Sequence, residues 1–424
     1  MAFEDDYWKY HDYRLSVHLQ EEPLPYIAHP PWNLAATSTQ WRAACLSTPK
    51  LWTRLQTSVH RCVKTAGICT NSLDTRCSLS LERWRGLPLV VDGLNVRCPS
   101  QISYLRIAAT QCHRWAGWRI NFEDIQGRDP LEDIMKESRN LGALRTLRYD
   151  GMQFHNHNFS LPFDCATLRP ENIILNARFE GDPHPSTNFS WFSVKTVVVP
   201  NHYGSMEDIF GLLRECPRLE RFSLAMDDCG NAVIQPGQPA IALEYLTFLD
   251  LDSCVSALCE LSLMQTPALR TVYLHSADIR LMGALTASPS RSGCSLESLS
   301  IPFTDRIDLA YFFSSMPTLQ ELALSGGPIR LQFDTTSLIA APKDMLKKLT
   351  REEQRPCLLP RLKFLRLQYI PFEPTLLGEV IASRSTLPED KEHSPSRRVD
   401  VFVAGAWAVR EPERLKSTAT PRRW

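Results

Sequence analysis

The sequence predicts an α/β protein in which short parallel strands alternate with helices in a repeating array. One apolar frame recurs along the chain at nearly even intervals, and two copies of it follow a helical pattern that ends in proline. Hydrophobic residues make up 43% of the 424 residues and charged residues 22%, which is typical of a folded globular chain.

The recurring frame has three apolar residues in the order apolar-x-x-apolar-x-apolar. In four copies a proline stands two residues before the first apolar position, as in Cys-Pro-Arg-Leu-Glu-Arg-Phe-Ser-Leu from Cys216; the others begin at Thr266, Met316 and Leu359. The main series starts at positions 194, 219, 246, 269, 296 and 319, with spacings of 25, 27, 23, 27 and 23 residues. Because leucine-rich repeats have a period of about 20–29 residues, the series predicts an irregular leucine-rich-repeat solenoid.

Further frames extend the array in both directions. They are Trp84/Leu87/Leu89, Trp115/Trp118/Ile120, Leu144/Leu147/Tyr149, a weaker Ile173/Leu175, and Leu362/Leu365/Leu367. The distance from 319 to 362 is too long for one repeat, so an insertion is expected there.

Helices are predicted between the frames because the apolar period changes from two to 3.6. Ile209, Leu212, Leu213 and Cys216 stand on one helical face before Pro217, and Leu309, Phe312, Phe313 and Met316 repeat that arrangement before Pro317. Proline ends each helix, since it lacks the amide hydrogen and disfavours helical geometry in the preceding residue. Each repeat is therefore predicted to be a helix, a proline stop and a strand, with parallel strands on the concave side and helices on the convex side.

The polar ladder that usually ties such loops together is predicted to be incomplete. The third position after the last apolar residue of the frame, usually Asn or Cys, is Cys254 once and otherwise Asp227, Ala277, Thr304 or Gly327. The solenoid should therefore be less regular, with varied loops.

Composition divides the chain into segments. Residues 1–31 are expected to be poorly ordered, residues 32–62 to form a compact helical segment, and residues 80–410 to form the solenoid. Within the solenoid, 327–359 is the insertion, with a charged and solvated helix from Lys343 to Arg355, and 385–398 is a disordered loop. A terminal strand is expected at 399–403 and a loose tail at 411–424.

The strongest local motif lies in the helical segment, from Pro31 to Trp52. It has Pro-Trp-x-Leu, then six residues, Trp-Arg, and later Leu-Ser-Thr-Pro-x-Leu-Trp. This motif resembles the second half of the F-box in a large fungal family of F-box proteins with leucine-rich-repeat-like C-terminal regions. Leu81-Glu-Arg-Trp-Arg-Gly-Leu-Pro-Leu89, His113-Arg-Trp-Ala-Gly-Trp118 and the Pro-x-Leu frames are also similar to that family.

The resemblance implies a small all-α F-box-like segment before the solenoid, and a substrate adaptor of a ubiquitin ligase. A Skp-type linker would bind the F-box-like segment, and the repeats would bind a protein substrate that the sequence does not identify. The residues it assigns to linker binding are Trp32, Leu34, Trp41, Arg42, Leu46, Pro49, Leu51 and Trp52. The size and spacing of Trp41 and Trp52 favour a role in a small helical core over direct contact with a partner.

The first helix of an F-box has no good counterpart in this sequence. Leu24-Pro25 is present, but only four residues separate it from Pro30, and Leu15, Val17 and Leu19 alternate with the period of a strand. Prolines at 23, 25, 30 and 31 exclude a continuous helix. Weak or undetectable binding to the Skp-type linker is therefore expected.

The residues between the frame positions should point to the concave face, where a protein partner would bind. The candidates for this face are Arg148, Asp150, Asp250, Asp252, Tyr273, His275, Arg366 and Gln368.

Other classes of function are disfavoured. The 47 basic and 47 acidic side chains give a net charge of zero, which argues against nucleic-acid binding. No apolar run is long enough to span a membrane. The 13 scattered cysteines, with no signal peptide ahead of them, indicate buried thiols in the cytoplasm or nucleus.

Catalysis and cofactor binding are not predicted. Glycine motifs for phosphates and the hydrolase motifs Gly-x-Ser-x-Gly and His-Glu-x-x-His are absent. His155 and His157, with Asp164 and Cys165 nearby, do not complete a tetrahedral metal site, and Cys45 is expected in a core. The sequence thus predicts a non-catalytic adaptor without cofactor or metal; the alternative is a repeat scaffold with no role in ubiquitin transfer.

Overall fold

The computed structural model describes most of the frames and the helices between them. The described residues are 30–56, 72–93, 99–121, 141–155, 168–180, 190–202, 206–226, 240–252, 263–275, 279–303, 309–326, 345–350, 358–368, 370, 372, 374–385 and 399–404. They belong to two compact units, residues 1–119 with 130–143 and residues 120–129 with 144–424. The predictions of poor order for residues 1–31 and of a disordered loop at 385–398 are wrong at Pro30, Pro31 and Ser385, which belong to helices. The rest of these ranges and the tail at 411–424 lie outside the described residues.

The first unit combines a helical hairpin with short strands and further helices. Its elements are α2 (Pro30–Thr37), α3 (Thr39–Ser47), the 3-10 helix η1 (Pro49–Trp52), β1 (Arg54–Gln56), α4 (Ser72–Arg83), β2 (Leu89–Gly93), α5 (Pro99–Ala109), η2 (Cys112–Arg114) and all but the last two residues of β3 (Trp115–Asn121). The strand order is β1-β2-β3, and β1 runs parallel to β2. The prediction that 32–62 is entirely helical is therefore wrong at residues 54–56, which pair with β2 through backbone hydrogen bonds.

Local sequence explains the turn between α2 and α3. The Ser38 hydroxyl accepts a hydrogen bond from the Trp41 amide at 3.1 Å and so caps the start of α3. The Thr48 hydroxyl donates to the Ala44 carbonyl at 2.8 Å near the end of α3, and Pro49 occupies the first position of η1.

The second unit is built on a parallel sheet. Its strands are β4 (Thr146–His155), β5 (Asn172–Glu180), β6 (Thr196–His202), β7 (Arg221–Met226), β9 (Phe248–Asp252), β11 (Thr271–Leu274), β12 (Ser298–Pro302), β13 (Glu321–Ser325), β14 (Phe364–Gln368) and β15 (Asp400–Ala404). They are neighbours in that order, and each pair is parallel. The expected terminal strand is confirmed as β15.

The apolar frames form the core of this unit. All three apolar positions are buried in each of the six main frames from Val194 to Leu324, and also in the frame from Leu362 to Leu367. Register places equivalent frame residues beside one another, as in Leu299, Leu322 and Leu365. The predicted α/β class and the register of the frames are therefore confirmed.

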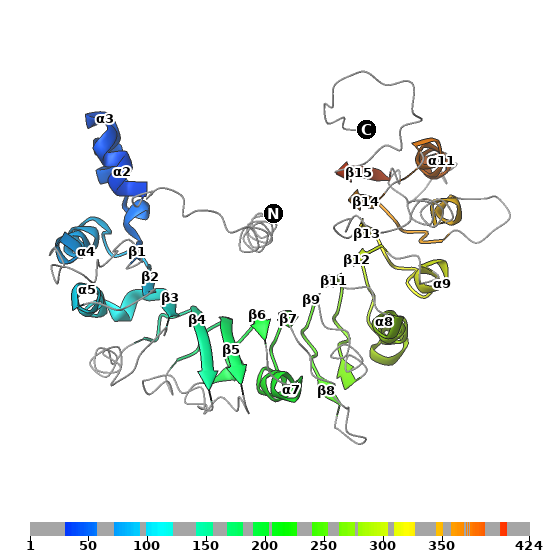
Figure 1. Cartoon of the computed structure of the whole chain (residues 1–424), viewed down its shortest axis with the longest axis horizontal. Coiled ribbons are helices and arrows are strands. Elements are labelled where there is room, and N and C mark those ends of the chain that lie inside the picture. The colour runs from blue at the N-terminus through cyan, green and yellow to red at the C-terminus, as the bar shows by residue number, and fades with distance from the viewer. Residues whose placement is uncertain are drawn as a thin grey trace, which may run out of the picture. The chain divides into compact units, whose positions relative to one another are not determined.

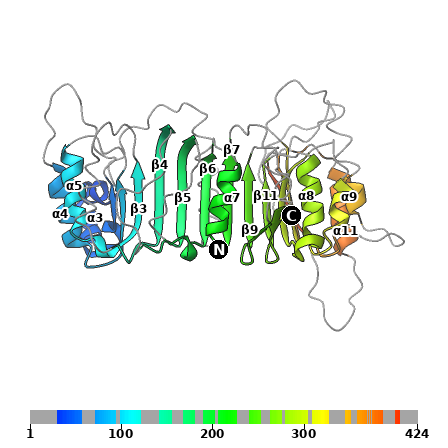
Figure 2. The ribbon, with the colours of Figure 1, turned by 90° about the horizontal axis from the view of Figure 1, so that it is seen from below.

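Helices cover one face of the second unit's sheet. They are α7 (Met206–Glu215), α8 (Ile279–Ser292), α9 (Leu309–Ser314) and α11 (Pro374–Ser385), with the 3-10 helix η3 (Trp191–Ser193) before β6. In Figure 1 the strands from β4 to β15 follow an arc with these helices on its outer side, and Figure 2 shows α7 on the outer face. We call the opposite face of this sheet the concave face.

The predicted helices α7 and α9 bury the expected residues. Ile209, Leu212 and Leu213 of α7 and Leu309, Phe312 and Phe313 of α9 are all buried. The uniform pattern of helix, proline and strand is wrong elsewhere, because the described residues directly before β9 and β11 form the short parallel strands β8 (Ile241–Ala242) and β10 (Met264–Gln265).

A ladder of backbone carbonyls joins the starts of the strands in the second unit. The carbonyl of Glu220, for example, accepts hydrogen bonds from the amides of Thr247 at 2.9 Å and Phe248 at 3.2 Å. The same double acceptance recurs at the carbonyls of Arg145, Glu171, Lys195, Glu220, Thr247, Arg270, Glu297 and Gln320. We call this set the carbonyl ladder. Exposed ion pairs accompany it between Arg145 and Glu171, Lys195 and Glu220, and Arg270 and Glu297.

The predicted insertion contains a described helical turn at residues 345–349. Met345, Leu346 and Leu349 are buried, while Lys347 and Lys348 are exposed, in keeping with a helix solvated on one side. The insertion does not interrupt the sheet, because β13 pairs directly with β14.

Candidate protein-binding surfaces

Two tryptophans and an arginine anchor the helical hairpin of the first unit. The Trp52 side chain is fully buried, and its indole N–H donates to the Cys45 carbonyl at 2.8 Å. The rings of Trp32 and Trp52 meet edge to face, with centroids 5.0 Å apart. The Arg83 guanidinium carbon lies 5.2 Å from the Trp32 centroid and 4.7 Å from that of Trp52. These contacts join α4 to α2 and η1.

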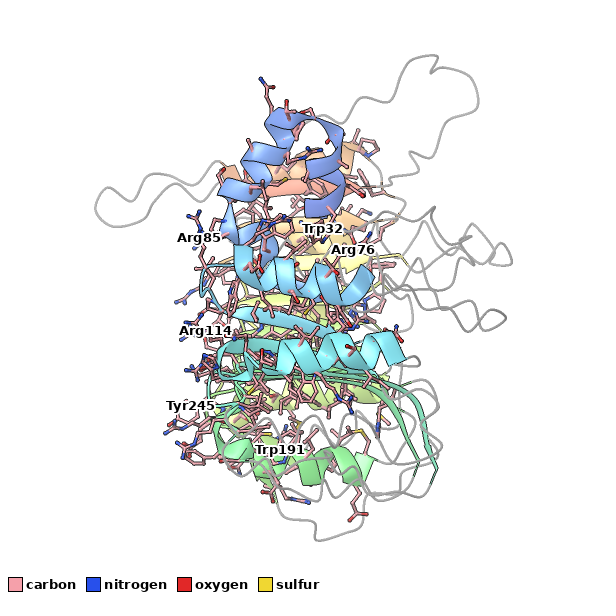
Figure 3. The ribbon with its side chains drawn as sticks, turned by 90° about the vertical axis from the view of Figure 1, so that its left-hand side faces the viewer. Trp32, Arg76, Arg85, Arg114, Trp191 and Tyr245 are labelled. Carbon is pink, nitrogen blue, oxygen red and sulfur yellow. The ribbon has the colours of Figure 1, made fainter. Side chains whose placement is uncertain are left out.

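A further arginine of α4 approaches the same tryptophan. The Arg76 guanidinium carbon is 5.9 Å from the Trp32 ring centroid, and Figure 3 shows the two residues near one another. Cationic groups over tryptophan faces stabilise such contacts by about 0.5–2 kcal/mol. The position of the hairpin is thus set by α4.

The hairpin exposes apolar side chains in spite of this anchoring. Trp41 is 54% exposed, Leu46 39% and Leu51 37%, and Cys45 is the buried residue of α3. The prediction that Trp41 belongs to a helical core is therefore wrong, whereas the core role of Trp52 agrees with its burial. We call Trp41 and Leu46 of α3, together with Leu51 of the adjoining η1, the exposed apolar residues of the hairpin.

The other residues assigned to linker binding are distributed between core and surface. Trp32, Leu34 and Pro49 are half-buried, and Arg42 is exposed, with its Nε donating to the Ala35 carbonyl at 3.1 Å. Arg42 thus ties α3 back to α2.

A carboxylate lies at the centre of the best-defined cluster on the concave face. Asp250 of β9 stands in register between Ser223 of β7 and Tyr273 of β11. The Ser223 hydroxyl donates to Asp250 Oδ2 at 2.8 Å, and His275 Nε2 lies 3.0 Å from Asp250 Oδ1. The structure therefore brings together Asp250, Tyr273 and His275, which the sequence predicted for this face.

An aromatic and cationic strip runs beside that carboxylate. The rings of Phe248 and Tyr273 have centroids 5.3 Å apart, and the Arg221 guanidinium carbon lies 4.0 Å from the Phe248 centroid. Burial lowers the pKa of Arg221, while Tyr273 and Asp250 act in the opposite direction. Arg221, Ser223, Phe248, Asp250, Tyr273 and His275 form what we call the central cluster.

The sequence analysis missed Arg221, Ser223 and Phe248. Each lies at an intervening position of its strand, so the alternation that selected Asp250 and Tyr273 also marks these residues. The signal was present, but only pairing across strands shows which intervening residues meet.

The other candidates for the concave face do not join the central cluster. Arg148 and Asp150 lie on β4, separated from β9 by β5, β6 and β7. Asp252 is half-buried at the end of β9. Gln368 and Arg366 are on β14, where the Arg366 guanidinium carbon lies 5.2 Å from the Phe402 centroid of β15.

Replacing Tyr273 with Ala is expected to weaken recovery of a bound protein partner by about tenfold or more, because aromatic residues beside polar groups dominate many interfaces. The melting temperature should change little, since Tyr273 is only half-buried. Quantitative affinity purification and thermal denaturation measure the two effects. Tyr311→Ala on α9 is the matched control, since Tyr311 is 72% exposed on the other side of the sheet. If Tyr273→Ala leaves partner recovery unchanged and Tyr311→Ala abolishes it, the partner does not bind the concave face.

The hydrogen bonds of the central cluster do not form a chain that activates a nucleophile. Ser223 donates to a carboxylate that also contacts His275, so the serine and the imidazole lie on opposite oxygens of Asp250. Cys45 is buried, burial raises the pKa of the Cys77 thiol to about 12, and it also raises the pKa of Cys216. The thiols of Cys77 and Cys216 therefore remain protonated near neutral pH.

Within the described part of the chain, no group of three or more His, Cys, Asp and Glu residues is placed to hold a metal ion. His155 ends β4, and His157, Asp164 and Cys165 lie outside the described residues.

Among the described helices, none has the length and apolar character needed to cross a membrane. The chain matches no protein-family model and no curated protein. Its function must therefore be inferred from its own residues.

Proposed function

We propose that the chain is a non-catalytic protein-binding adaptor that selects substrates for a ubiquitin ligase of the Skp–cullin–F-box type. The observation that carries this proposal is the exposure of Trp41, Leu46 and Leu51 on a hairpin that is otherwise firmly anchored. The hairpin would belong to an F-box-like segment, and the sheet of the second unit to an irregular leucine-rich-repeat solenoid.

Energetics favours a binding role for the exposed apolar residues of the hairpin. A tryptophan and two leucines left in water lose about 25 cal/mol of hydrophobic stabilisation for each Å² of apolar surface that a partner could bury. Exposed apolar surface is typical of interaction sites where such side chains form one patch. The buried Trp52 and the Arg83 contacts supply a preformed scaffold, so little conformational entropy is lost on binding.

The concave face supports the proposed binding of a protein substrate. A parallel sheet with a fixed register is a wide and rigid platform for a protein partner. The central cluster presents tyrosine and arginine beside a carboxylate, which is the composition of interface hot spots.

Direct titration of purified chain with a purified Skp-type linker tests the proposal. Binding weaker than about 10 μM is expected, because the sequence offers no counterpart of the first F-box helix. The double variant Trp41→Ala/Leu46→Ala should weaken it by a further tenfold or more. The control Tyr311→Ala should bind as the wild type does.

Submicromolar binding would support the proposed function and refute the expectation that the first helix is needed. Equal binding by the wild type and the double variant would show that Trp41 and Leu46 do not contribute to linker binding.

The alternative is a solenoid scaffold with no role in ubiquitin transfer. The poor match at residues 12–30 to a first F-box helix favours it. Affinity purification of the tagged chain distinguishes the two functions. Recovery of Skp and cullin supports the adaptor, and a different stable partner without them supports the scaffold.

A further inference from the structure

We infer that Thr48 is a phosphorylation site for a proline-directed protein kinase, one that modifies serine or threonine before proline. The phosphate loosens the end of the helical hairpin and weakens binding at its exposed apolar residues. The effect on binding rests on the proposed function, whereas the modification itself does not.

Exposure distinguishes Thr48 from the other described residues that precede proline. Proline follows Thr48, Thr266 and Ser288 in the described part of the chain, and Ser394 and Thr420 outside it. Thr266 is 3% exposed and Ser288 7%, whereas Thr48 lies on the surface. Because a kinase must place the acceptor hydroxyl against ATP in its own cleft, Thr48 is the acceptor among these three.

Thr48 stands at a break between two helices. It follows the last residue of α3 and precedes Pro49, the first residue of η1. Proline disfavours helical geometry in the residue before it, and Thr48 has a φ of −113° and a ψ of 86°. The segment can therefore enter a kinase cleft with less local unfolding than a residue inside a helix would need.

The phosphoryl group comes from ATP bound to the kinase. Thr48 Oγ1 attacks the γ-phosphorus, and the new O–P bond forms as the bond from that phosphorus to the bridging oxygen breaks. ADP leaves with the electron pair of the broken bond, and a carboxylate of the kinase accepts the hydroxyl proton.

A phosphate at Thr48 opposes two hydrogen bonds at the end of α3. The Thr48 hydroxyl donates to the Ala44 carbonyl at 2.8 Å, and the Thr48 amide donates to the Cys45 carbonyl at 3.2 Å. Phosphorylation removes the hydroxyl hydrogen and adds a charge of about −1.5 to −2 beside these carbonyls. The negative end of the helix dipole also repels an anion there, so the last turn of α3 is destabilised.

The same phosphate alters the surface that we assign to linker binding. Leu46 and Leu51, both exposed, lie two residues before Thr48 and three residues after it. Residues 30–56 contain three basic residues and no acidic residue, so the phosphate cancels about half or more of their formal charge. A partner that buries Leu46 and Leu51 would also have to desolvate the phosphate, which disfavours binding.

Treatment of the full chain with a mitogen-activated type of protein kinase and MgATP tests the modification. Peptide mass spectrometry should find phosphate at Thr48 and none at Thr266 or Ser288. Synthetic peptides of residues 42–54, 261–271 and 283–293 should all be phosphorylated, because they present the same motifs without the fold. The inference is overturned if the kinase rejects peptide 42–54, if it leaves Thr48 of the folded chain unmodified, or if Thr266 and Ser288 are modified as fully as Thr48.

Ser47→Ala is the matched control for Thr48→Val. Ser47 is also exposed and its hydroxyl donates to the same Ala44 carbonyl at 3.0 Å, but no proline follows it. Ser47→Ala should retain phosphorylation at residue 48, and Thr48→Val should lose it. Loss of the Thr48 phosphate in Ser47→Ala would contradict recognition through Pro49.

Amide hydrogen exchange and linker titration measure the effect of the phosphate. Exchange at residues 44–51 should accelerate about tenfold, and affinity for the Skp-type linker should fall about tenfold or more. Kinase-treated Thr48→Val is the reference, since it lacks this phosphate but keeps any at Ser394 and Thr420. Exchange or linker affinity equal to that of this reference would overturn the effect on the hairpin.

The modification and the proposed function can fail separately. Mass spectrometry and amide exchange need no linker, so they decide the inference even if the unmodified chain does not bind one. Absence of linker binding by the unmodified chain would refute the proposed function alone.

Discussion

Replacing Leu322 with Asp is expected to unfold the sheet of the second unit around β13. Leu322 is buried at the middle position of its frame, in register between Leu299 of β12 and Leu365 of β14. A carboxylate at this position has no counter-charge in the apolar core and costs several kcal/mol, on the order of the stability of an entire domain. Circular dichroism and thermal denaturation should show loss of a cooperative transition, and the variant should be poorly soluble.

Ala323→Asp is the matched control on the same strand. Ala323 is half-buried on the opposite face, in register with Arg366. An aspartate there remains hydrated and close to a cation, so the melting temperature should change by only a few degrees. If both variants melt like the wild type, the frame residues do not form the core.

Replacing Arg384 with Met is expected to lower the free energy of unfolding by about 3 kcal/mol or more. Arg384 is buried near the end of α11, and its guanidinium donates to three backbone carbonyls: Leu349 at 3.0 and 3.2 Å, Leu358 at 2.6 Å and Leu359 at 2.9 Å. Methionine fills similar space but removes the Arg384 donors, and a buried carbonyl that loses its donor costs about 1–3 kcal/mol. The Leu359 carbonyl keeps its hydrogen bond from the Leu362 amide at 3.1 Å.

Urea denaturation of Arg384→Met and Arg384→Lys distinguishes hydrogen bonding from charge. Lysine keeps the charge but cannot reproduce the planar fork of donors, so its stability should lie between those of the Met variant and the wild type. Amide exchange should accelerate most in the 345–349 turn and around Leu359. A Met variant as stable as the wild type would show that these bonds contribute nothing net.

The frames could be predicted because their burial depends on a local pattern. Three apolar residues on one face of a short strand must face the core wherever the strand lies, so Leu322 and its equivalents are evident from spacing alone. The same holds for α7 and α9, whose buried faces end at a proline.

What depends on contacts distant in sequence could not be predicted. Trp41 has the size of a core residue, but no other described element covers it, so it remains exposed. Arg384 resembles any surface arginine until three carbonyls from other segments surround it. Helix α8 contains Pro289 and ends before Gly293, which has a φ of +68°, so it lacks the proline stop that marks α7 and α9.

The residues of the central cluster could be predicted from the sequence only in part. Alternation places Asp250, Tyr273 and His275 on one face, and the frames give their strands. The partnership of Asp250 with Ser223 and the stacking of Arg221 on Phe248 require the register across β7, β9 and β11.

Because of the carbonyl ladder, the geometry of the sheet does not depend on how long the segments between its strands are. Glu297 and Gln320 are 23 positions apart, whereas Gln320 and Lys363 are 43 apart, yet the same pair of backbone hydrogen bonds joins each step. Since lengthening a loop costs little closure entropy, insertions between strands leave the register intact. The connecting segments of this chain can thus diverge in length and sequence over evolutionary time while the strands, and the side chains they present, keep their positions.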